Sequence, residues 1–348
     1  MVNFTKSSIF FSKNTKDSTI LSIKSILNLN QIPPLAKYLG LPLFFHRNKA
    51  AAFEDIKQKI LNIISGWKAK LLSQAAKTIL IKTVANYIPT YSMSLFKFPS
   101  RLCKDLDTAA RKFWWDFPNN KAHNLSLLSW KKICSPKSLG GLGIRLMGDH
   151  NSALLAKLGW KILNKENLLW VRATRGKYLR NVDLLDAPVQ PSASWIWKGI
   201  LSTLGIVSEG ACKTISMSSM FNVWDTPWIS SLPLFKPLPN MNTPINPSLC
   251  VADLIDPVTR TWMPDLIFQA FDVLSAENIM KIHVPRSAPS SDWFWAPNSQ
   301  GTFTVNSAHD IAACVSNYTN GPLSSADWNC LWSLKLQHRL KHLLWRIA

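Results

Sequence analysis

The stretch FEDIKQKILNIISGWKAKLLSQAAKTILIKTVANYIP, residues 53–89, decides the fold, because its apolar residues recur at steps of three and four. Side chains at that spacing lie on one face of an α-helix. Gly66 marks a bend, Ser73 is suited to cap a second helix, and Pro89 ends that helix. The stretch therefore predicts two successive helices, each with an apolar face.

The helical periodicity continues towards the C-terminus. One predicted helix covers about residues 102–115 and is closed by Pro118. A tight turn at Gly140-Gly141-Leu142-Gly143 follows, and another helix begins after it with Asp149 or Asn151 as its N-cap. We therefore expect these segments to form one helical domain.

The rest of the chain shows weaker patterns. The first 48 residues are typical of short strands and loops, and the proline-rich residues 181–270 predict a loose connector. The expected elements after residue 180 are strands near 216–217, 222–224 and 301–305, and helices over 271–282 and from Asn306 or Ser307 to 315. The predicted fold class is mainly α with small β elements (α+β). The predicted segments are 1–48, 49–180, 181–270 and 271–348.

Positive charge is concentrated in the first half of the sequence. The 348 residues carry 40 Lys and Arg against 20 Asp and Glu, a formal net charge of +20. Residues 1–180 hold 30 of these basic residues and eight acidic ones, whereas residues 181–348 hold ten and twelve. Such one-sided charge predicts a polyanionic partner. The alternative is a basic surface that only aids solubility.

The sequence argues against secretion and membrane insertion. The start Met1-Val2-Asn3-Phe4-Thr5-Lys6 lacks the apolar core of a signal peptide, and no apolar run reaches the ~18 residues of a membrane helix. The six cysteines are scattered, unlike the disulfide framework of a small secreted protein. We therefore expect an intracellular protein of the nucleus or cytoplasm, with no membrane partner.

The candidate nucleic-acid-binding residues are basic side chains placed between the apolar positions of the predicted helices. Three of them, Lys157, Lys161 and Lys165, step by four along one predicted helix face. As a group they lack the acidic neighbours that solvated helix faces usually carry four positions away, which favours phosphate contacts. Taken singly, each is typical of a solvated helix face. The full set is Lys57, Lys68, Lys70, Lys77, Lys82, Arg111, Lys112, Lys131, Lys132, Lys157, Lys161 and Lys165.

Aromatic residues alternate with these cations. Trp67 precedes Lys68, and Trp160 precedes Lys161. Rings beside cations stack on bases while the cations neutralise phosphates. The alternative is that aromatic residues at helical spacing form the core.

The sequence contains no arrangement typical of an active site. Polymerases and nucleases cluster carboxylates around two divalent ions, but Glu54-Asp55 is the only adjacent acidic pair in residues 1–180. No Cys-x-x-Cys pair is present for zinc, and His338 and His342 lack the glutamate of a His-Glu-x-x-His site. The glycine turn lacks the Gly-Lys-Ser/Thr ending of a phosphate loop. We predict no catalytic residues, no metal, no cofactor and no small-molecule substrate.

Several segments, in order, resemble the region downstream of the reverse transcriptase in plant LINE-type non-LTR retrotransposon polyproteins. Tyr38-Leu39-Gly40-Leu41-Pro42-Leu43 resembles the hexapeptide after the palm, and Ile88-Pro89-Thr90-Tyr91 resembles part of the helical segment that follows, a thumb. Trp224-Asp225-Thr226-Pro227-Trp228 resembles a connector motif. Gly301-Thr302-Phe303-Thr304-Val305-Asn306-Ser307-Ala308 resembles the start of the reverse-transcriptase zinc-binding domain.

The resemblance implies an internal fragment that runs from the end of the palm, through a basic thumb-like domain, to the start of the zinc-binding domain. The family's Tyr-x-Asp-Asp falls upstream of Met1 and its zinc ligands fall beyond Ala348, so we expect a non-catalytic fragment. Its basic helical region would grip the backbone of RNA, DNA or an RNA–DNA hybrid without sequence preference. The alternatives are an RNA-directed DNA polymerase accessory segment that needs a palm in trans, and an inert pseudogene product.

Overall fold

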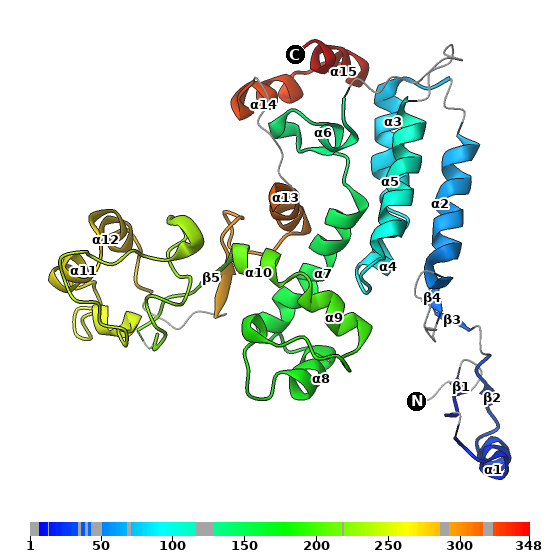
Figure 1. Ribbon diagram of the computed structural model, residues 1–348, viewed down its shortest axis with the longest axis horizontal. Helices are drawn as coiled ribbons and strands as arrows, with labels where there is room; N and C mark the ends of the chain where they lie inside the picture. Colours follow the sequence, from blue (N-terminus) through cyan, green and yellow to red (C-terminus); the bar gives the residue numbers. More distant parts are fainter. Residues whose placement is uncertain are drawn as a thin grey trace. The chain divides into compact units, whose positions relative to one another are not determined.

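The structure is a computed structural model that describes residues 7–12, 14–33, 36–38, 41–42, 51–67, 71–115, 128–217, 219–285, 292–315 and 323–348. The chain divides into two compact units, Met1–Asn62 and Ile63–Ala348. Helices predominate among the described residues and the strands are short (Figure 1). The predicted class, mainly α with small β elements, is therefore confirmed.

The first unit is built from short strands and helices. Strand β1 pairs in parallel with β2, and β3 pairs antiparallel with β4. The elements are β1 (Ser8–Ile9), α1 (Asp17–Leu27), β2 (Asn30–Gln31), β3 (Lys37–Tyr38), β4 (Leu41–Pro42), η2 (Ala51–Phe53) and the beginning of α2 (Glu54–Gly66).

The prediction of strands and loops alone for residues 1–48 is wrong at α1. Asp17 lies in the first turn of this helix and Lys24 in its last turn, and charges of these signs complement the helix dipole. Asn28 ends the helix in the left-handed conformation, and its N–H donates to the carbonyl of Lys24. No side chain of α1 is buried. Ile20, Ile23 and Leu27 follow one another at steps of three and four, so a helical spacing is present in the sequence and was overlooked.

The second unit contains most of the helices. Its elements are α3 (Gln74–Leu80), η4 (Ile81–Ala85), α4 (Thr90–Met93), α5 (Ser100–Trp115), α6 (Trp130–Cys134), η5 (Lys137–Leu139), α7 (Met147–Leu163), α8 (Leu169–Tyr178), η6 (Leu184–Asp186), α9 (Trp195–Leu201), α10 (Leu204–Gly210), β5 (Ala211–Lys213), η7 (Pro233–Phe235), η8 (Val251–Leu254), α11 (Pro264–Ala270), α12 (Val273–Met280), β6 (Trp293–Trp295), α13 (Val305–Val315), α14 (Ser325–Ser333) and α15 (His338–Ile347).

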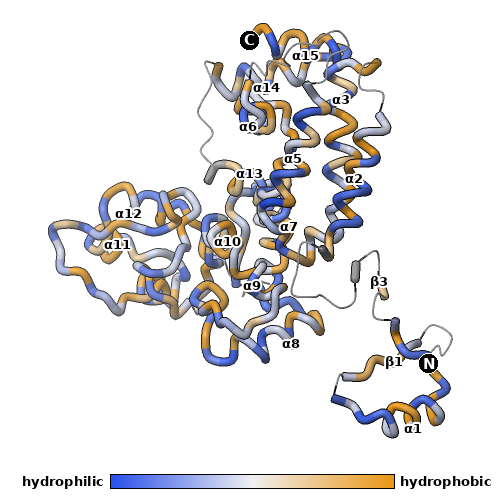
Figure 2. Tube along the Cα trace, turned by 45° about the vertical axis from the view of Figure 1, so that its right-hand side comes forward, coloured by the Kyte–Doolittle hydropathy of each residue, from blue (hydrophilic) through white to orange (hydrophobic). Residues whose placement is uncertain are grey.

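The first helices of this unit begin where the sequence predicts them. Ser73 caps α3, because its Oγ accepts a hydrogen bond from the N–H of Ala76 at 3.2 Å. The π-helical turn η4 follows without a break. Helix α5 is amphipathic, with Leu106 and Trp114 buried and Arg111 exposed. Figure 2 shows hydrophilic and hydrophobic residues alternating along it.

Helix α7 packs against α4, α5, α9, α10 and α13. It begins at Met147, whose N–H donates to Oδ1 of Asp107 on α5 at 3.2 Å. The prediction that Asp149 or Asn151 caps this helix is therefore wrong. Asp149 lies in the first turn, and Asn151 lies inside the helix and is buried. The Asn151 side chain instead accepts from the N–H of Phe98 at 2.8 Å, which ties α7 to the segment before α5.

The glycine turn is confirmed as a structural turn. Gly140 and Gly143 have φ angles of 80° and 66°, which side chains disfavour. A Cβ on Gly141 would lie 2.0 Å from the carbonyl oxygen of Ser135, so no other residue fits there. The turn folds the chain back on the end of α6 before it enters α7, because the N–H of Leu142 donates to the carbonyl of Ile133 at 2.8 Å.

The small sheet of the second unit was not predicted. Strand β5 pairs antiparallel with β6, and Cys212 lies opposite Phe294. The strand predicted over 301–305 is wrong, because α13 starts at Val305 and the Oγ1 of Thr304 accepts from the N–H of Ser307 at 3.1 Å. The strands predicted near 216–217 and 222–224 are also wrong, since Asn222 makes only an isolated bridge.

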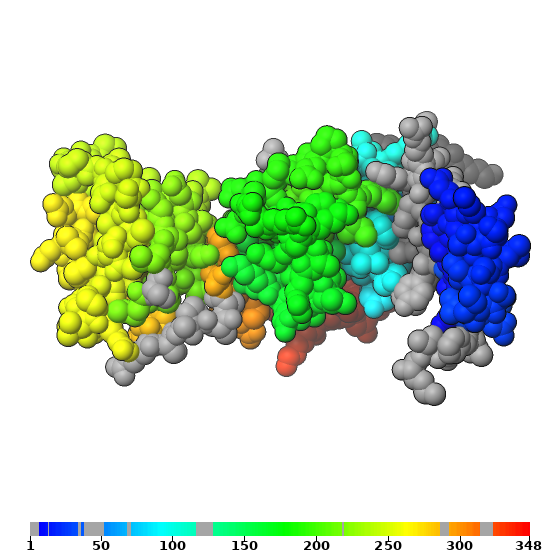
Figure 3. Space-filling model, turned by 90° about the horizontal axis from the view of Figure 1, so that it is seen from below, coloured from blue at the N-terminus to red at the C-terminus, as the bar shows by residue number. Residues whose placement is uncertain are grey.

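Two of the apolar cores that the described residues of the second unit form are set apart by the elements that build them. One is formed by α7, α9, α10, the β5–β6 pair and α13, and it includes Trp160, Trp197 and Trp295. The other includes Trp228 and Phe271 and draws only on residues 215–284. Figure 3 shows much of this stretch gathered in one lobe, coloured from yellow-green to yellow.

The last helices pack on earlier parts of the second unit. Helix α13 contacts α7, α14 contacts η5, and α15 contacts α3. The boundaries predicted at residues 48, 180 and 270 stay predictions. No helix in the described ranges is long and apolar enough to cross a membrane.

Candidate nucleic-acid interface

A cleft of about 600 Å³ lies at the C-terminal end of α7. It brings together three of the predicted binding residues, Lys157, Lys161 and Lys165, with aromatic side chains from far along the chain. One wall comes from α7 and the turn after it, and the other comes from β6 and the loop before α13. The remaining lining residues are Trp160, Asn164, Glu166, Asn167, Trp293, Gly301, Thr302 and Phe303.

The turn at the end of α7 sets the position of the lysines. The N–H of Glu166 donates to the carbonyl of Lys161 at 3.1 Å, and the N–H of Lys165 donates to the carbonyl of Ile162 at 3.2 Å. These two bonds form a Schellman motif, in which the residue after the helix cap is left-handed. Lys165 occupies that position with φ 53°. The predicted helix face is thus interrupted, because Lys165 lies beyond the end of α7 at Leu163.

Because Lys165 has a left-handed backbone, two substitutions there should differ in their effect on stability but not in their effect on nucleic-acid binding. A left-handed backbone costs a non-glycine residue about 1 kcal/mol more than glycine. The free energy of unfolding of the Lys165→Gly variant is therefore expected to be about 1 kcal/mol higher than that of Lys165→Ala. Both variants lose the same charge. Urea denaturation measures the difference, and nucleic-acid affinity should fall equally in both variants. Equal stability of the two variants would contradict the assigned backbone geometry.

Aromatic side chains form the other wall of the cleft. Phe303 stacks on Trp160, with ring centroids 5.9 Å apart, and also packs on Trp295 at 4.6 Å. The β5–β6 pairing places Trp293 beside Lys213, whose Nζ lies 4.5 Å from the indole centroid. This wall therefore offers ring surface next to the lysines of α7, an arrangement that suits bases and phosphates together.

Two of the three lysines have acidic partners. Lys161 Nζ lies 2.8 Å from Glu166 Oε2, and Lys165 Nζ lies 3.3 Å from Asp292 Oδ2. No acidic residue lies four positions from these lysines, as the sequence indicates, but the turn after α7 and the residue before β6 supply carboxylates that helical spacing does not reveal. Lys157 is exposed. The Lys165–Asp292 pair is exposed, and pairs of this kind contribute little to stability, so an incoming phosphate competes with it at small cost.

Helix α5 carries a second basic face. The predicted residues Arg111 and Lys112 are exposed, and so are Arg101 and Lys104. At 3.6 residues per turn these four positions fall on one side of the helix, over about 16 Å of its length. Arg101 and Lys104 were not predicted, although their spacing from Arg111 places them on the same face.

The other predicted cations are dispersed. Lys131 and Lys132 are exposed on α6, and Lys57 is half-buried on α2 in the first unit. The remaining pair, Lys68 and Lys70, lies outside the described residues.

Two predicted cations are not solvent-facing. Lys77 is only 1% exposed, and its Nζ lies 5.7 Å from the ring centroid of Phe113. Its apolar stem fills space between α3 and α5, which removes the side chain from any surface for phosphate. Lys82 is half-buried, and its Nζ donates to the carbonyl of Leu142 at 3.2 Å.

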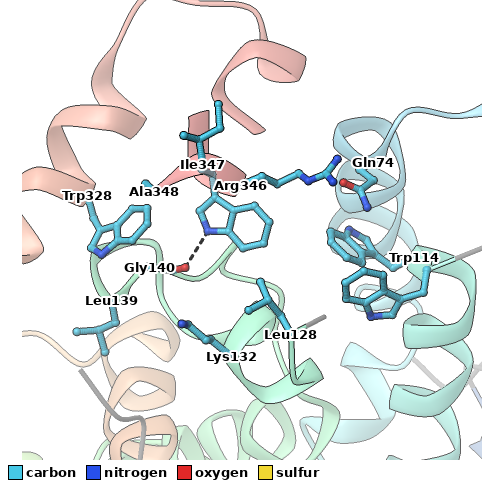
Figure 4. A pocket seen from close by; sticks show the side chains of 12 residues that line it. Gln74, Trp114, Leu128, Lys132, Leu139, Gly140, Trp328, Arg346, Ile347 and Ala348 are labelled. Atoms are coloured by element: carbon cyan, nitrogen blue, oxygen red, sulfur yellow. Dashed lines mark hydrogen bonds between the residues drawn. The ribbon is translucent and has the colours of Figure 1, made fainter. Parts of the chain in front are cut away.

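A second cavity, of about 370 Å³, is lined in part by indole rings. Its walls include Trp114, Trp115, Trp328 and Trp345. The indole N–H of Trp345 donates to the carbonyl of Gly140 at 2.8 Å, a bond that Figure 4 draws as a dashed line at Gly140. The pocket is apolar and the tryptophans mostly pack on one another, as expected of core aromatics.

Sequence reasoning missed Trp293 and Phe303 as parts of the interface. They lie more than 120 residues from Lys157, and no local pattern connects them with it. It also missed the exposed basic residues Arg172 and Lys177 on α8, the helix that follows the α7 side of the cleft in the sequence. Their charge is visible in the sequence, but the helix start at Leu169 has no polar cap to mark it.

Potential metal-binding groups are not clustered in the part of the chain that the structure describes. Within it, no three His, Cys, Asp or Glu side chains lie close enough to hold one metal ion. The absence of catalytic and metal residues in this chain stays a prediction.

Comparison with known proteins connects the chain to plants. No protein-family model matches it. It is 29% identical over 331 residues to the Arabidopsis thaliana protein named "Putative ribonuclease H protein At1g65750", covering 88% of this chain and half of that relative's length. It is 34% identical over 156 residues to the "Uncharacterized mitochondrial protein AtMg00310" of the same plant, covering 44% of this chain and 99% of that protein.

These relationships support a plant retroelement-related protein. Because nearly all of the mitochondrial protein is matched at 34% identity, the chain belongs to the family of AtMg00310.

Proposed function

We propose that this chain binds the sugar–phosphate backbone of RNA, DNA or an RNA–DNA hybrid without sequence preference. The observation that carries the proposal is the cleft at the end of α7, where Lys157, Lys161 and Lys165 face the rings of Trp293 and Phe303. The exposed cations of α5 extend the basic surface. The ribonuclease H named in one relative is an enzyme that acts on nucleic acid, which agrees with this proposal.

A salt titration of the intact chain tests the proposal. The logarithm of affinity for a single-stranded oligonucleotide should fall linearly with the logarithm of salt concentration, with a slope of about −0.7 to −0.9 per phosphate neutralised. The triple variant Lys157→Gln, Arg111→Gln and Lys112→Gln changes only exposed side chains and should flatten the slope by about 2 to 3. Filter binding measures both slopes.

The matched control is Lys281→Gln, an exposed lysine at the end of α12 in the half without basic excess. It should bind as the unchanged chain does. A flat salt response of the unchanged chain, or no retention of oligonucleotide at low salt, contradicts the proposed function.

We further propose that the chain derives from a reverse transcriptase of a LINE-type non-LTR retrotransposon and has a non-catalytic role. The ordered motifs from the palm end to the zinc-binding start support this origin, and the basic helices α3 to α7 match the place of a thumb. Primer extension by the purified chain with Mg²⁺ is expected to stay at background. Extension above background, abolished by EDTA, would contradict the non-catalytic role.

A further inference from the structure

Three basic residues, Lys82, Lys137 and Arg145, border the glycine turn between η5 and α7, and the charges of Lys137 and Arg145 act on Lys82. The Nζ of Lys82 and the Cγ of Lys137 each lie 3.6 Å from the point that a Cβ on Gly143 would occupy. Lys82 is oriented by its hydrogen bond to the carbonyl of Leu142. The missing side chain of Gly143 thus leaves a small space between the ammonium of Lys82 and the stem of Lys137. The Nζ of Lys137 lies 4.7 Å from the ring centroid of Trp332.

Arg145 is the third cation of this cluster. Its backbone is fixed to the end of η4, because the side-chain amide of Asn86 donates to the Arg145 carbonyl at 3.0 Å. Its guanidinium donates to Oδ1 of Asn306 at 3.2 Å and lies 3.5 Å from Nδ1 of His150. Neither neighbour is an acid, so the charge of Arg145 stays uncompensated there.

The cluster has no carboxylate of its own. In the described part of the chain, no ion pair includes Lys82, Lys137 or Arg145. The pKa of Lys82 is lowered, first by burial and then by the charges of Lys137 and Arg145. The nearby His342 has a pKa lowered to about 4, by burial and then by His338 and the two lysines. At neutral pH this histidine is uncharged, and the remaining cations repel one another.

The backbone of the turn does not supply an anion cradle. The N–H of Gly143 donates to the Ser135 carbonyl at 2.9 Å, and that of Leu142 donates to the Ile133 carbonyl at 2.8 Å. The N–H of Gly141 is also used, by the carbonyl of Pro136. Any anion here is therefore held by side chains and not by a phosphate-loop type of backbone nest.

We propose that Lys82, Lys137 and Arg145 bind one phosphate group of a nucleic-acid strand at the Gly143 turn. The three cations would suit a free phosphate as well, and the choice of a nucleic-acid strand as the ligand rests on the proposed function. Lys137 is exposed, and Lys82, Gly143 and Arg145 are half-exposed, so solvent reaches the site. A phosphate offers several anionic oxygens to three cations at once, whereas a carboxylate offers two.

The first test measures thermal unfolding of the intact chain in chloride and in inorganic phosphate at equal ionic strength. Phosphate should raise the Tm by about 1–3 °C at ten times its Kd. The variant Lys82→Met keeps the stem and removes the charge, so it should melt higher than the unchanged chain in chloride and show no phosphate response. Lys281→Met, the control, should respond as the unchanged chain does. If phosphate does not raise the Tm of the unchanged chain, or raises that of Lys82→Met equally, the proposed phosphate site is wrong.

The second test uses a single-stranded oligonucleotide without terminal phosphates. Lys82→Met should flatten the salt slope of binding by about 0.7 to 0.9, the value for one phosphate contact. The exposed Lys137→Gln should act in the same direction, which keeps the test valid if Lys82→Met folds poorly. Failure of the unchanged chain to bind the oligonucleotide overturns the proposed function. Normal binding with unchanged slopes in both variants overturns this inference alone, even where free phosphate stabilises the chain.

Discussion

Replacing Trp295 with alanine is expected to lower the free energy of unfolding by about 3–5 kcal/mol, the usual cost of truncating a buried tryptophan. The side chain is fully buried, and its Nε1–H donates to Oγ of Ser307 at 2.8 Å. The packing is tight, since a Cβ on Gly210 would lie 2.3 Å from the indole. The cavity left behind is bordered by Phe303, which should lose its position in the wall of the cleft.

The same variant should therefore lose nucleic-acid affinity under conditions in which it stays folded. The matched control is Trp262→Ala, which removes a buried tryptophan from the other core. Both variants should lose stability of similar size in urea denaturation, but only Trp295→Ala should bind an oligonucleotide more weakly at low temperature. If the two variants bind the oligonucleotide with equal affinity, the cleft is not part of the nucleic-acid binding site.

Replacing Asp107 with asparagine is expected to stabilise the protein at alkaline pH. Burial raises the pKa of this carboxyl from 3.8 to about 7, against the lowering effect of the bond from the Met147 N–H, and Asp149 raises it further. The folded state thus holds the proton more tightly than the unfolded state, so stability falls as pH rises from about 4 to about 7 and stays low above that range. Asparagine keeps an acceptor for the Met147 N–H and removes the buried charge.

The expected gain is about 1–3 kcal/mol at pH 8, less than the full value of the pKa difference, because a carboxylate at a helix N-terminus is itself favourable. The gain should vanish near pH 4. Urea denaturation across this pH range measures it, and Asp265→Asn, an exposed aspartate in the first turn of α11, is the control. A less stable Asp107→Asn at pH 8 would mean that the ionised carboxylate is a net benefit to the fold.

The sequence predicted the features that depend on neighbours a few residues away. Ser73 as a cap, the extent of α5 and the glycine turn all follow from local spacing and backbone chemistry, and the structure agrees with each. The cap of α7 was wrong because Asp107, which accepts the bond from the first N–H of that helix, is 40 residues distant. No local signal distinguishes this arrangement from a cap by Asp149.

The candidate site could be predicted only in part, for the same reason. Lys157 and Lys161 were identified on one helix face, and they do line the cleft. The partner of Lys165, Asp292, is 127 residues away, and the rings opposite the lysines come from the same distant segment. Lys77 was misread because a long lysine stem on an otherwise apolar face packs against Phe113 as a hydrophobic side chain does.

The β5–β6 pairing has a consequence for how the chain is put together. It holds Lys213 opposite Trp293, and the N–H of Thr214 donates to the carbonyl of Asp292 at 3.0 Å. Residues 214–292 therefore leave and rejoin the helical body at adjacent points, and they enclose a core of their own. Such a lobe has a core separate from the one around α7, so a substitution in the lobe core need not alter the packing behind the cleft.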